Sequence, residues 1–261
     1  MNFIKTDDSK TINEFRKALY KTFVAPLDSM WQDLYIASSQ AYLIKKDNKH
    51  IGYCCIDSNA ALLQVFVTNE NRCLMQTIVR ELIDSKHISS ASLSAIEPVS
   101  FNACLFHSAS MKTNTFCYEY SNRPLNDKNS LNVELVTPEY SNAIRSYYKE
   151  HVGFDDTFGY VDNLVSRNEL YMSLENDKII ATGECRLSDT QSNYADVGVS
   201  VNKEHRKKGL ATKMLQQMAL KAIEQDRHPI CSTTIDNVGS QKAIERAGFY
   251  CSNIIFDMKF N

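Results

Sequence analysis

The chain has 261 residues, of which 43% are hydrophobic and 23% are charged, and its 29 basic and 31 acidic side chains give a net charge of −2. This composition is typical of a globular protein with one large domain or two ordinary ones. The even charge balance argues against a general nucleic-acid binder, because such binding depends on the neutralisation of phosphates. We therefore expect no nucleic-acid partner.

The cysteines and the N-terminal segment bear on the compartment. No two of the eight cysteines form a C-x-x-C pair, so their spacing does not support a zinc or redox motif, and we expect no metal site. Residues 1–15 lack the apolar core of a signal peptide, and no apolar run reaches transmembrane length. The sequence predicts a soluble, cytoplasmic protein with reduced thiols and no membrane partner.

The pattern of the chain predicts two halves. Residues 121–132 are polar, contain a proline and lack periodicity, so they are predicted to form a linker. Predicted elements of the second half, in chain order, are a strand at 132–138, a helix at 138–153, a hairpin of strands at 169–176 and 178–189, a strand at 194–201, a helix that starts after Gly209, a strand at 229–235, a helix at 240–248 and a strand at 252–260. This order of elements is that of a mixed α/β domain.

The first half resembles a second copy of this domain. Alignment of Val67 with Val201 places Arg72 on Arg206, and residues 92–97 and 113–120 then parallel 231–236 and 252–260. A chance alignment of two amphipathic helices is the alternative. The copies differ at three positions: Met75, Thr77 and Pro98 of the first half stand where the second half has Gly209, Ala211 and Asn237.

The basic run "HRKKGLATKML" begins the clearest helix, in which apolar residues recur every four positions from Leu210 to Ala222. A helix N-terminus presents unpaired N–H groups and partial positive charge, so it binds anions. The small residues Gly209 and Ala211 would let a pyrophosphate approach the backbone. A phosphate site is therefore one interpretation of the run, and a solvated charge run or an RNA contact are the alternatives.

Three motifs of the second half carry a family resemblance. The pattern Arg206-x-x-Gly209-x-Ala211, after a strand, resembles the acetyl-CoA signature R/Q-x-x-G-x-G/A of the GNAT acetyltransferase superfamily. The stretches 237–240 and 246–249 resemble the family's "N-x-x-(A/S)" and "K-x-G-F" motifs. The resemblance covers residues 132–261, while the first half resembles a degenerate copy only.

This resemblance implies an α/β fold of two tandem GNAT-like domains, each a twisted mixed sheet flanked by helices. Residues 1–124 would form the degenerate domain without a cofactor site, and residues 132–261 would form the domain that binds acetyl-CoA. The residues that the resemblance assigns to the cofactor are Val199, Ser200 and Val201 for the pantetheine arm, Arg206 at the rim, Lys207, Lys208, Gly209, Leu210, Ala211 and Thr212 for the pyrophosphate, and Asn237 for the pantetheine. Asn237 could equally cap the next helix.

At the positions where the family has its catalytic side chains, this chain has residues of other types. Ile244 stands where many members have a tyrosine that protonates the departing thiolate, and Ser232 stands where some members have a glutamate base. A third base position falls at Ala195, next to Asp196. We assign Asp196 as the candidate base, acting on the amine through water, on this ground; a purely structural role for Asp196 is the alternative.

The predicted function is transfer of an acetyl group from acetyl-CoA to a primary amine of a small molecule or peptide. The alternative is a non-catalytic module that binds or senses an acyl-CoA. The segment 151–160 is expected near the acceptor, and Asp155 and Asp156 there would either attract a cationic amine or simply be solvated. The sequence specifies neither the acceptor nor the oligomeric state.

Overall fold

The computed structural model describes residues 1–122 and 131–261, which divide into two compact units. Unit 1 consists of Met1–Cys117 and Ser252–Asn261, and unit 2 consists of Tyr118–Cys251. The units depart from the predicted limits 1–124 and 132–261 at their ends, because the last segment of the chain belongs to unit 1. Most of the predicted linker 121–132 lies outside the described residues.

Unit 1 has the order of strands and helices that the internal similarity predicts. Its elements are β1 (Asn2–Lys5), α1 (Ser9–Tyr20), the π-helical turn η1 (Trp31–Ile36), β2 (Gln40–Lys46), β3 (Lys49–Ile56), β4 (Ala61–Val67), the 3₁₀ turn η2 (Asn69–Leu74), α2 (Met75–Asp84), β5 (Ser90–Ser94), α3 (Pro98–His107) and β6 (Ser108–Tyr120). The end of the last strand of the chain, β12 (Phe249–Phe260), pairs with β5 in this unit.

Unit 2 contains the predicted strands and helices of the second half and one helix that the sequence did not predict. Its elements are β7 (Glu134–Leu135), η4 (Pro138–Tyr140), α4 (Ser141–Tyr147), the π-helical turn η5 (Tyr148–Val152), α5 (Tyr160–Ser166), β8 (Leu170–Glu175), β9 (Lys178–Leu187), β10 (Tyr194–Val201), η6 (Lys203–His205), α6 (Leu210–Ile223), β11 (His228–Thr234), α7 (Val238–Arg246) and the start of β12. The mixed α/β class is confirmed.

Local sequence explains the elements that were predicted. Asn176 and Asp177 both take positive φ, at 50° and 60°, as a tight β8–β9 hairpin requires. The four-residue apolar repeat of α6 packs Met214 and Met218 onto β9, where Gly183 leaves room for their sulfur atoms. The hairpin and this helix are confirmed.

Helix α5 lies between the predicted helix at 138–153 and the predicted strand at 169–176, where the sequence predicts no element. It has only seven residues, and its start is fixed from outside by the Asp156 side chain, which accepts hydrogen bonds from the Tyr160 and Val161 N–H groups at 2.7 and 2.9 Å. Such a remote cap leaves little pattern in the helix itself, so sequence periodicity missed it.

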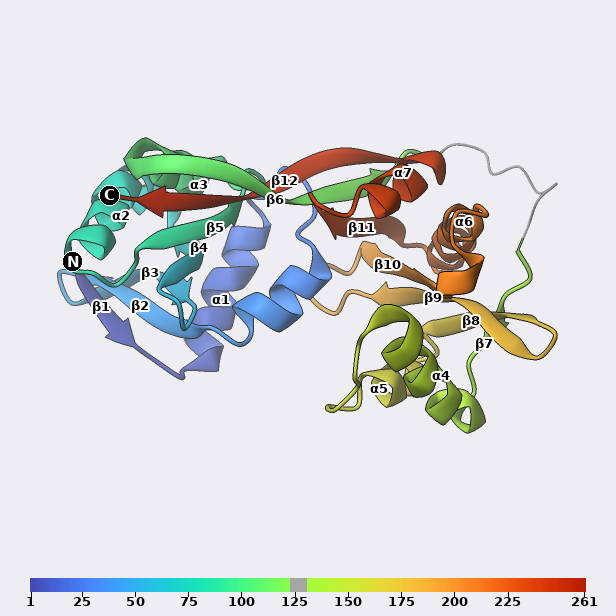
Figure 1. Cartoon of the computed structure of the whole chain (residues 1–261). Helices are drawn as coiled ribbons and strands as arrows, with labels where there is room; N and C mark the ends of the chain where they lie inside the picture. Colours follow the sequence, from blue (N-terminus) through green and yellow to red (C-terminus); the bar gives the residue numbers. More distant parts are fainter. Residues whose placement is uncertain (123–130) are drawn as a thin grey trace. The chain divides into compact units, whose positions relative to one another are not determined.

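The sheet of unit 2 has helices on both faces: α6 covers one face, and α4 and α5 lie on the other (Figure 1). Strands β9 and β10 pair antiparallel along their whole common length, from Ala195↔Leu187 to Val201↔Ala181. The parallel pairing of β10 with β11, in contrast, covers only Tyr194–Asp196 among the described residues. Beyond Asp196, the backbone groups on the edge of β10 that faces β11 are available to pair with an extended ligand.

Among the described helices, none is both long and apolar enough to cross a lipid bilayer. All eight cysteines lie within the described residues, and none of them is part of a disulfide bond. The cytoplasmic location stays a prediction.

Candidate functional site

The loop that joins β10 to α6 has the backbone of an anion site. Lys207 and Gly209 both take left-handed φ values, of 62° and 81°. The first hydrogen bond of the following turn runs from the Lys213 N–H to the Gly209 carbonyl. The N–H groups of residues 210–212 precede it and have no partner inside the helix, so they can bind an anion.

Gly209 contributes its conformation as well as its small size. A Cβ atom added to Gly209 would meet nothing within 4 Å. The space in front of the loop is therefore open, and the positive φ is the reason for a glycine at this position. Lys207 and Lys208 are exposed beside it and add positive charge.

Arg206 has a different role from its neighbours. Its Nη2 donates to the His151 carbonyl at 2.8 Å, and its Nε donates to the Val201 carbonyl at 3.3 Å. The guanidinium thus joins the end of β10 to the C-terminal end of η5. It shapes the loop, while the lysines supply the charge at the rim.

The predicted pantetheine strand lies at the open edge of β10. Two neighbouring hydroxyl groups fix the side chain of Ser200 in this strand. The Ser200 hydroxyl lies 2.7 Å from the Thr182 hydroxyl and donates to the Tyr147 hydroxyl at 3.5 Å. Asn237 caps α7, because its Oδ1 accepts from the Ser240 N–H at 3.2 Å. The capping role is the one that the structure shows for Asn237.

A polar network lies on the face of β9 and β10 that is opposite α6. Cross-strand pairs place Thr182 beside Ser200, Glu184 beside Gly198 and Arg186 beside Asp196. Because side chains alternate along a strand, these polar groups all point to the same face. The sheet therefore presents charged and hydroxyl groups toward α4, η5 and α5.

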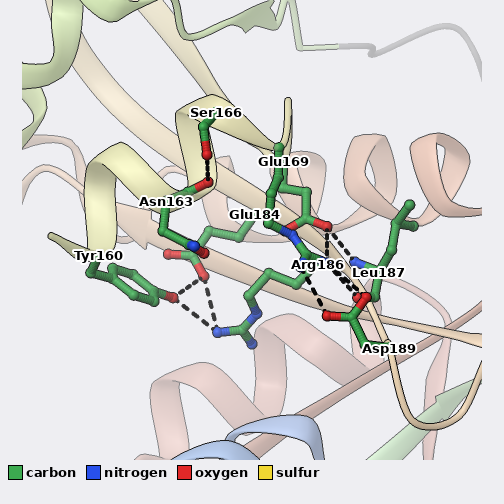
Figure 2. A network of polar contacts seen from close by, with 9 residues as sticks. Tyr160, Asn163, Ser166, Glu169, Glu184, Arg186, Leu187 and Asp189 are labelled. Carbon is green, nitrogen blue, oxygen red and sulfur yellow. Dashed lines mark hydrogen bonds and ion pairs between the residues drawn. The ribbon is translucent and has the colours of Figure 1, made fainter.

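Glu184 is the centre of this network. Its Oε2 accepts from the Tyr160 hydroxyl at 2.7 Å and lies 3.3 Å from Arg186 Nη1 (Figure 2). Its Oε1 accepts from the Tyr148 hydroxyl at 3.1 Å. The side chain is 15% exposed, so solvent reaches it. Gly198 makes the position possible, since a Cβ there would lie 3.2 Å from Glu184 Oε2.

The tyrosines around Glu184 remain neutral donors. Burial, followed by the neighbouring Glu184 carboxylate, raises the pKa of Tyr148 well above its ordinary value and also raises the pKa of Tyr160. Burial raises the pKa of Tyr147 to about 12. At neutral pH the Tyr148 and Tyr160 hydroxyl groups therefore donate to Glu184 and hold its carboxylate in place, while the Tyr147 hydroxyl contacts Ser200.

Asp196, the base that the sequence suggested, is only 2% exposed and lies 2.8 Å from Arg186 Nη2. Arg186 thus holds two carboxylates, Asp196 on one side and Glu184 on the other. Because a base must exchange its proton with water or substrate, the accessible Glu184 is better placed than the enclosed Asp196.

Sequence reasoning missed Glu184, although a signal was present. Polar residues alternate on the predicted strands as Thr182, Glu184 and Arg186, and again as Asp196 and Ser200. Such alternation predicts a polar face of two adjacent strands. The family's positions point elsewhere, to residues 195 and 232 for a base and to residue 244 for the acid.

The remaining predicted positions have structural roles. Ile244 is buried and carries no titratable group. Asp156 is the cap of α5, and although burial alone would raise its pKa, the backbone N–H groups of Val161, Tyr160 and Phe158 and the charge of Arg145 lower it. Asp155 forms an exposed ion pair with Lys149.

In the corresponding loop of unit 1, a backbone hydrogen bond is made at the start of the helix. The 3₁₀ turn η2 runs directly into α2, and the Met75 N–H bonds to the Arg72 carbonyl. Met75 itself is buried. A cavity of about 30 Å³ beside β4 and β5 is lined by apolar side chains that include Leu19 of α1, Leu27 of the following segment, and Trp31 and Ile36 of η1. Unit 1 thus lacks the open turn that unit 2 has.

Comparison with known proteins gives the class of both units. Residues 133–249 match the family model "Acetyltransferase (GNAT) family", and residues 8–121 match the model "Acetyltransferase (GNAT) domain". Both halves of the chain are therefore GNAT domains, and the protein belongs to this family as a tandem of two. Family membership supports acyl transfer from an acyl-CoA.

Solved structures agree with this assignment. A GNAT-family acetyltransferase from Colwellia psychrerythraea superposes with a TM-score of 0.95 at 27% identity, with 100% of each chain covered. A GCN5-related N-acetyltransferase from Sphaerobacter thermophilus gives a TM-score of 0.61 at 15% identity, covering 89% of this chain and 84% of that one. A tandem GNAT protein from the clavulanic acid biosynthesis pathway gives 0.60 at 13% identity, covering 99% and 98%. No curated protein matches the sequence.

Proposed function

We propose that unit 2 transfers an acetyl group from acetyl-CoA to a primary amine, and that unit 1 binds no CoA. The supporting observation is that the open anion-binding turn at Gly209 and the carboxylate of Glu184 flank the same strand, β10. The N–H groups of residues 207–212 would hold the pyrophosphate, and the open edge of Val199–Val201 would pair with the pantetheine arm.

The residues fit this donor by their chemistry. Helix α6 directs its free N–H groups to an open space that two exposed lysines border, which suits a pyrophosphate. Acetyl-CoA, when bound, supplies an acyl group activated as a thioester. The departing thiol has an ordinary pKa near ~8.5, so its departure at neutral pH needs little help from an acid. The absence of a tyrosine at Ile244 is therefore compatible with turnover.

Glu184 is the residue that we assign to the acceptor. A neutral amine is required for attack, and the carboxylate accepts the proton that the amine nitrogen loses. Tyr148, Tyr160 and Arg186 fix the position of the carboxylate. A backbone N–H of β10 would stabilise negative charge on the carbonyl oxygen.

The test is release of free thiol from acetyl-CoA in the presence of a panel of primary amines. We expect amine-dependent release, and a decrease of about 10²–10⁴-fold in kcat for Glu184→Gln, the usual size of a general-base contribution. If acetyl-CoA binds but no amine releases thiol, the alternative of a non-catalytic acyl-CoA-binding or sensor module is supported instead.

A further inference from the structure

A short loop of aromatic residues lies beside the Glu184 network. It spans residues 153–159, and glycines in left-handed conformation bound it, with φ of 84° at Gly153 and 81° at Gly159. Asp156 anchors its centre, because its fully enclosed carboxylate caps α5 and lies 3.6 Å from Arg145 Nε. The loop therefore has a defined position over this part of unit 2.

Two phenylalanines of the loop form a continuous aromatic group with a tyrosine of the network. The ring centroids of Phe154 and Phe158 are 5.9 Å apart, and those of Phe154 and Tyr160 are 5.6 Å apart. Phe158 lies 6.1 Å from Tyr160 and is 65% exposed, although it is a large apolar side chain. Phe158 thus presents an apolar ring to solvent beside the half-buried rings of Phe154 and Tyr160, where it is available to pack against the apolar part of a ligand.

The inner end of this aromatic group is anionic. The Tyr160 hydroxyl donates to Glu184 Oε2, and Arg186 is shared between Glu184 and Asp196. One positive and two negative charges give these three side chains a net charge of −1. Two ion pairs nearby, Lys149–Asp155 and Arg145–Asp162, add no net charge. The site thus combines an apolar outer wall with one excess negative charge at its base.

We propose that the acceptor is a primary amine attached to an aromatic or similarly bulky apolar group. The ring lies against Phe154 and Phe158, and the nitrogen lies at Glu184. A small aliphatic amine fills only the anionic end, and a polyamine places further charges against apolar rings, where they lose hydration. The inference rests on the proposed function, since it names the substrate class of the same site.

The experiment compares kcat/KM of the full-length protein for 2-phenylethylamine, n-butylamine and spermidine. We expect 2-phenylethylamine to be preferred over n-butylamine by about tenfold or more. Phe158→Ala should bring the two values together, while Phe158→Tyr, which keeps the ring, should retain the preference. Val152→Ala is the matched control, because Val152 is also an exposed apolar side chain near the loop and should leave the preference unchanged.

Equal kcat/KM for the aromatic and aliphatic amines would overturn the inference, and so would a preference that persists in Phe158→Ala. A second measurement separates this outcome from failure of the proposed function. Calorimetric titration of 2-phenylethylamine into the protein with CoA present reports binding without turnover. Binding that is lost in Phe158→Ala supports the aromatic site even if no amine is acetylated, and lack of binding by wild type refutes it.

Discussion

Arg186 Nη2 lies 2.8 Å from Asp196 Oδ1, and this ion pair joins the neighbouring strands β9 and β10. The same guanidinium lies 3.3 Å from Glu184 Oε2, so one cation holds two carboxylates of unequal exposure. Asp196 is thus the enclosed carboxylate and Glu184 the accessible one, and substitution of each residue can distinguish their roles.

The first prediction concerns the acidic limb of the pH dependence of kcat/KM. The sequence suggests Asp196 as the base that is responsible for this limb, whereas the greater exposure of Glu184 favours Glu184. We expect Glu184→Gln to abolish the limb and Asp196→Asn to retain it. Asp196→Asn should instead lower the free energy of unfolding by about 1.5–3 kcal/mol, as for a lost hydrogen bond to a charged group. Urea denaturation with an unchanged m value measures that loss. A missing acidic limb in Asp196→Asn would restore Asp196 as the base.

The second prediction concerns the loop that precedes α6. Gly209→Glu should abolish acetyl-CoA binding, because it places a bulky, negatively charged side chain at the helix N-terminus that would bind pyrophosphate. Gly153→Glu is the matched control, since both glycines have φ above 80° and open space around the Cβ position. Both variants should lose about 1–2 kcal/mol of stability from the left-handed backbone. Calorimetry that shows equal acetyl-CoA affinity in the two variants would remove the loop from the site.

The third prediction concerns stoichiometry. Because η2 closes the α2 N-terminus and Met75 is buried, we expect the full-length chain to bind one acetyl-CoA. Calorimetric titration measures the number, and Gly209→Glu should abolish the single binding event. Two sites per chain, or one site that persists in Gly209→Glu, would place a CoA site in unit 1.

The fourth prediction concerns alkaline stability. Burial raises the pKa of Tyr147 to about 12, and burial together with the Glu184 carboxylate raises the pKa of Tyr148 well above its ordinary value. Because the folded-state pKa lies above the unfolded-state value of about 10, the unfolded chain loses these protons first, and stability falls as pH rises above 10. Below pH 10 the contribution is fully present. Denaturation between pH 9 and 12 should show a shallower fall in Tyr147→Phe than in wild type, with the exposed Tyr250→Phe as control.

The fifth prediction concerns Ile244. Since the side chain is buried, Ile244→Ala should cost about 2–4 kcal/mol of stability through loss of packing. The pH profile of kcat/KM should keep its shape, because no group that titrates is removed. A shifted alkaline limb in this variant would mean that position 244 affects the proton donor.

Periodicity and turn residues predicted most of unit 2. The apolar repeat of α6 and the Asn176–Asp177 turn are local features, so the residues that determine them are neighbours in the sequence. Arg206 shows the opposite case: its motif position was recognised, but its partner, the His151 carbonyl, lies 55 residues away. The network around Glu184 likewise depends on Tyr160, which belongs to the unpredicted helix α5. Contacts made across the fold leave no pattern within one segment.

The pairing of β12 with β5 affects the order in which the chain can fold during synthesis. Asp257 of β12 accepts a hydrogen bond from Ser92, 165 residues earlier, and β12 lies between β5 and β6 in the sheet order. During synthesis the N-terminal segment emerges first, yet its sheet lacks a central strand until the ribosome reaches the final residues. Until then β5 and β6 each present an unpaired edge, which is a site of aggregation. The unit that is translated first is therefore the one whose sheet depends on residues translated later than all of unit 2.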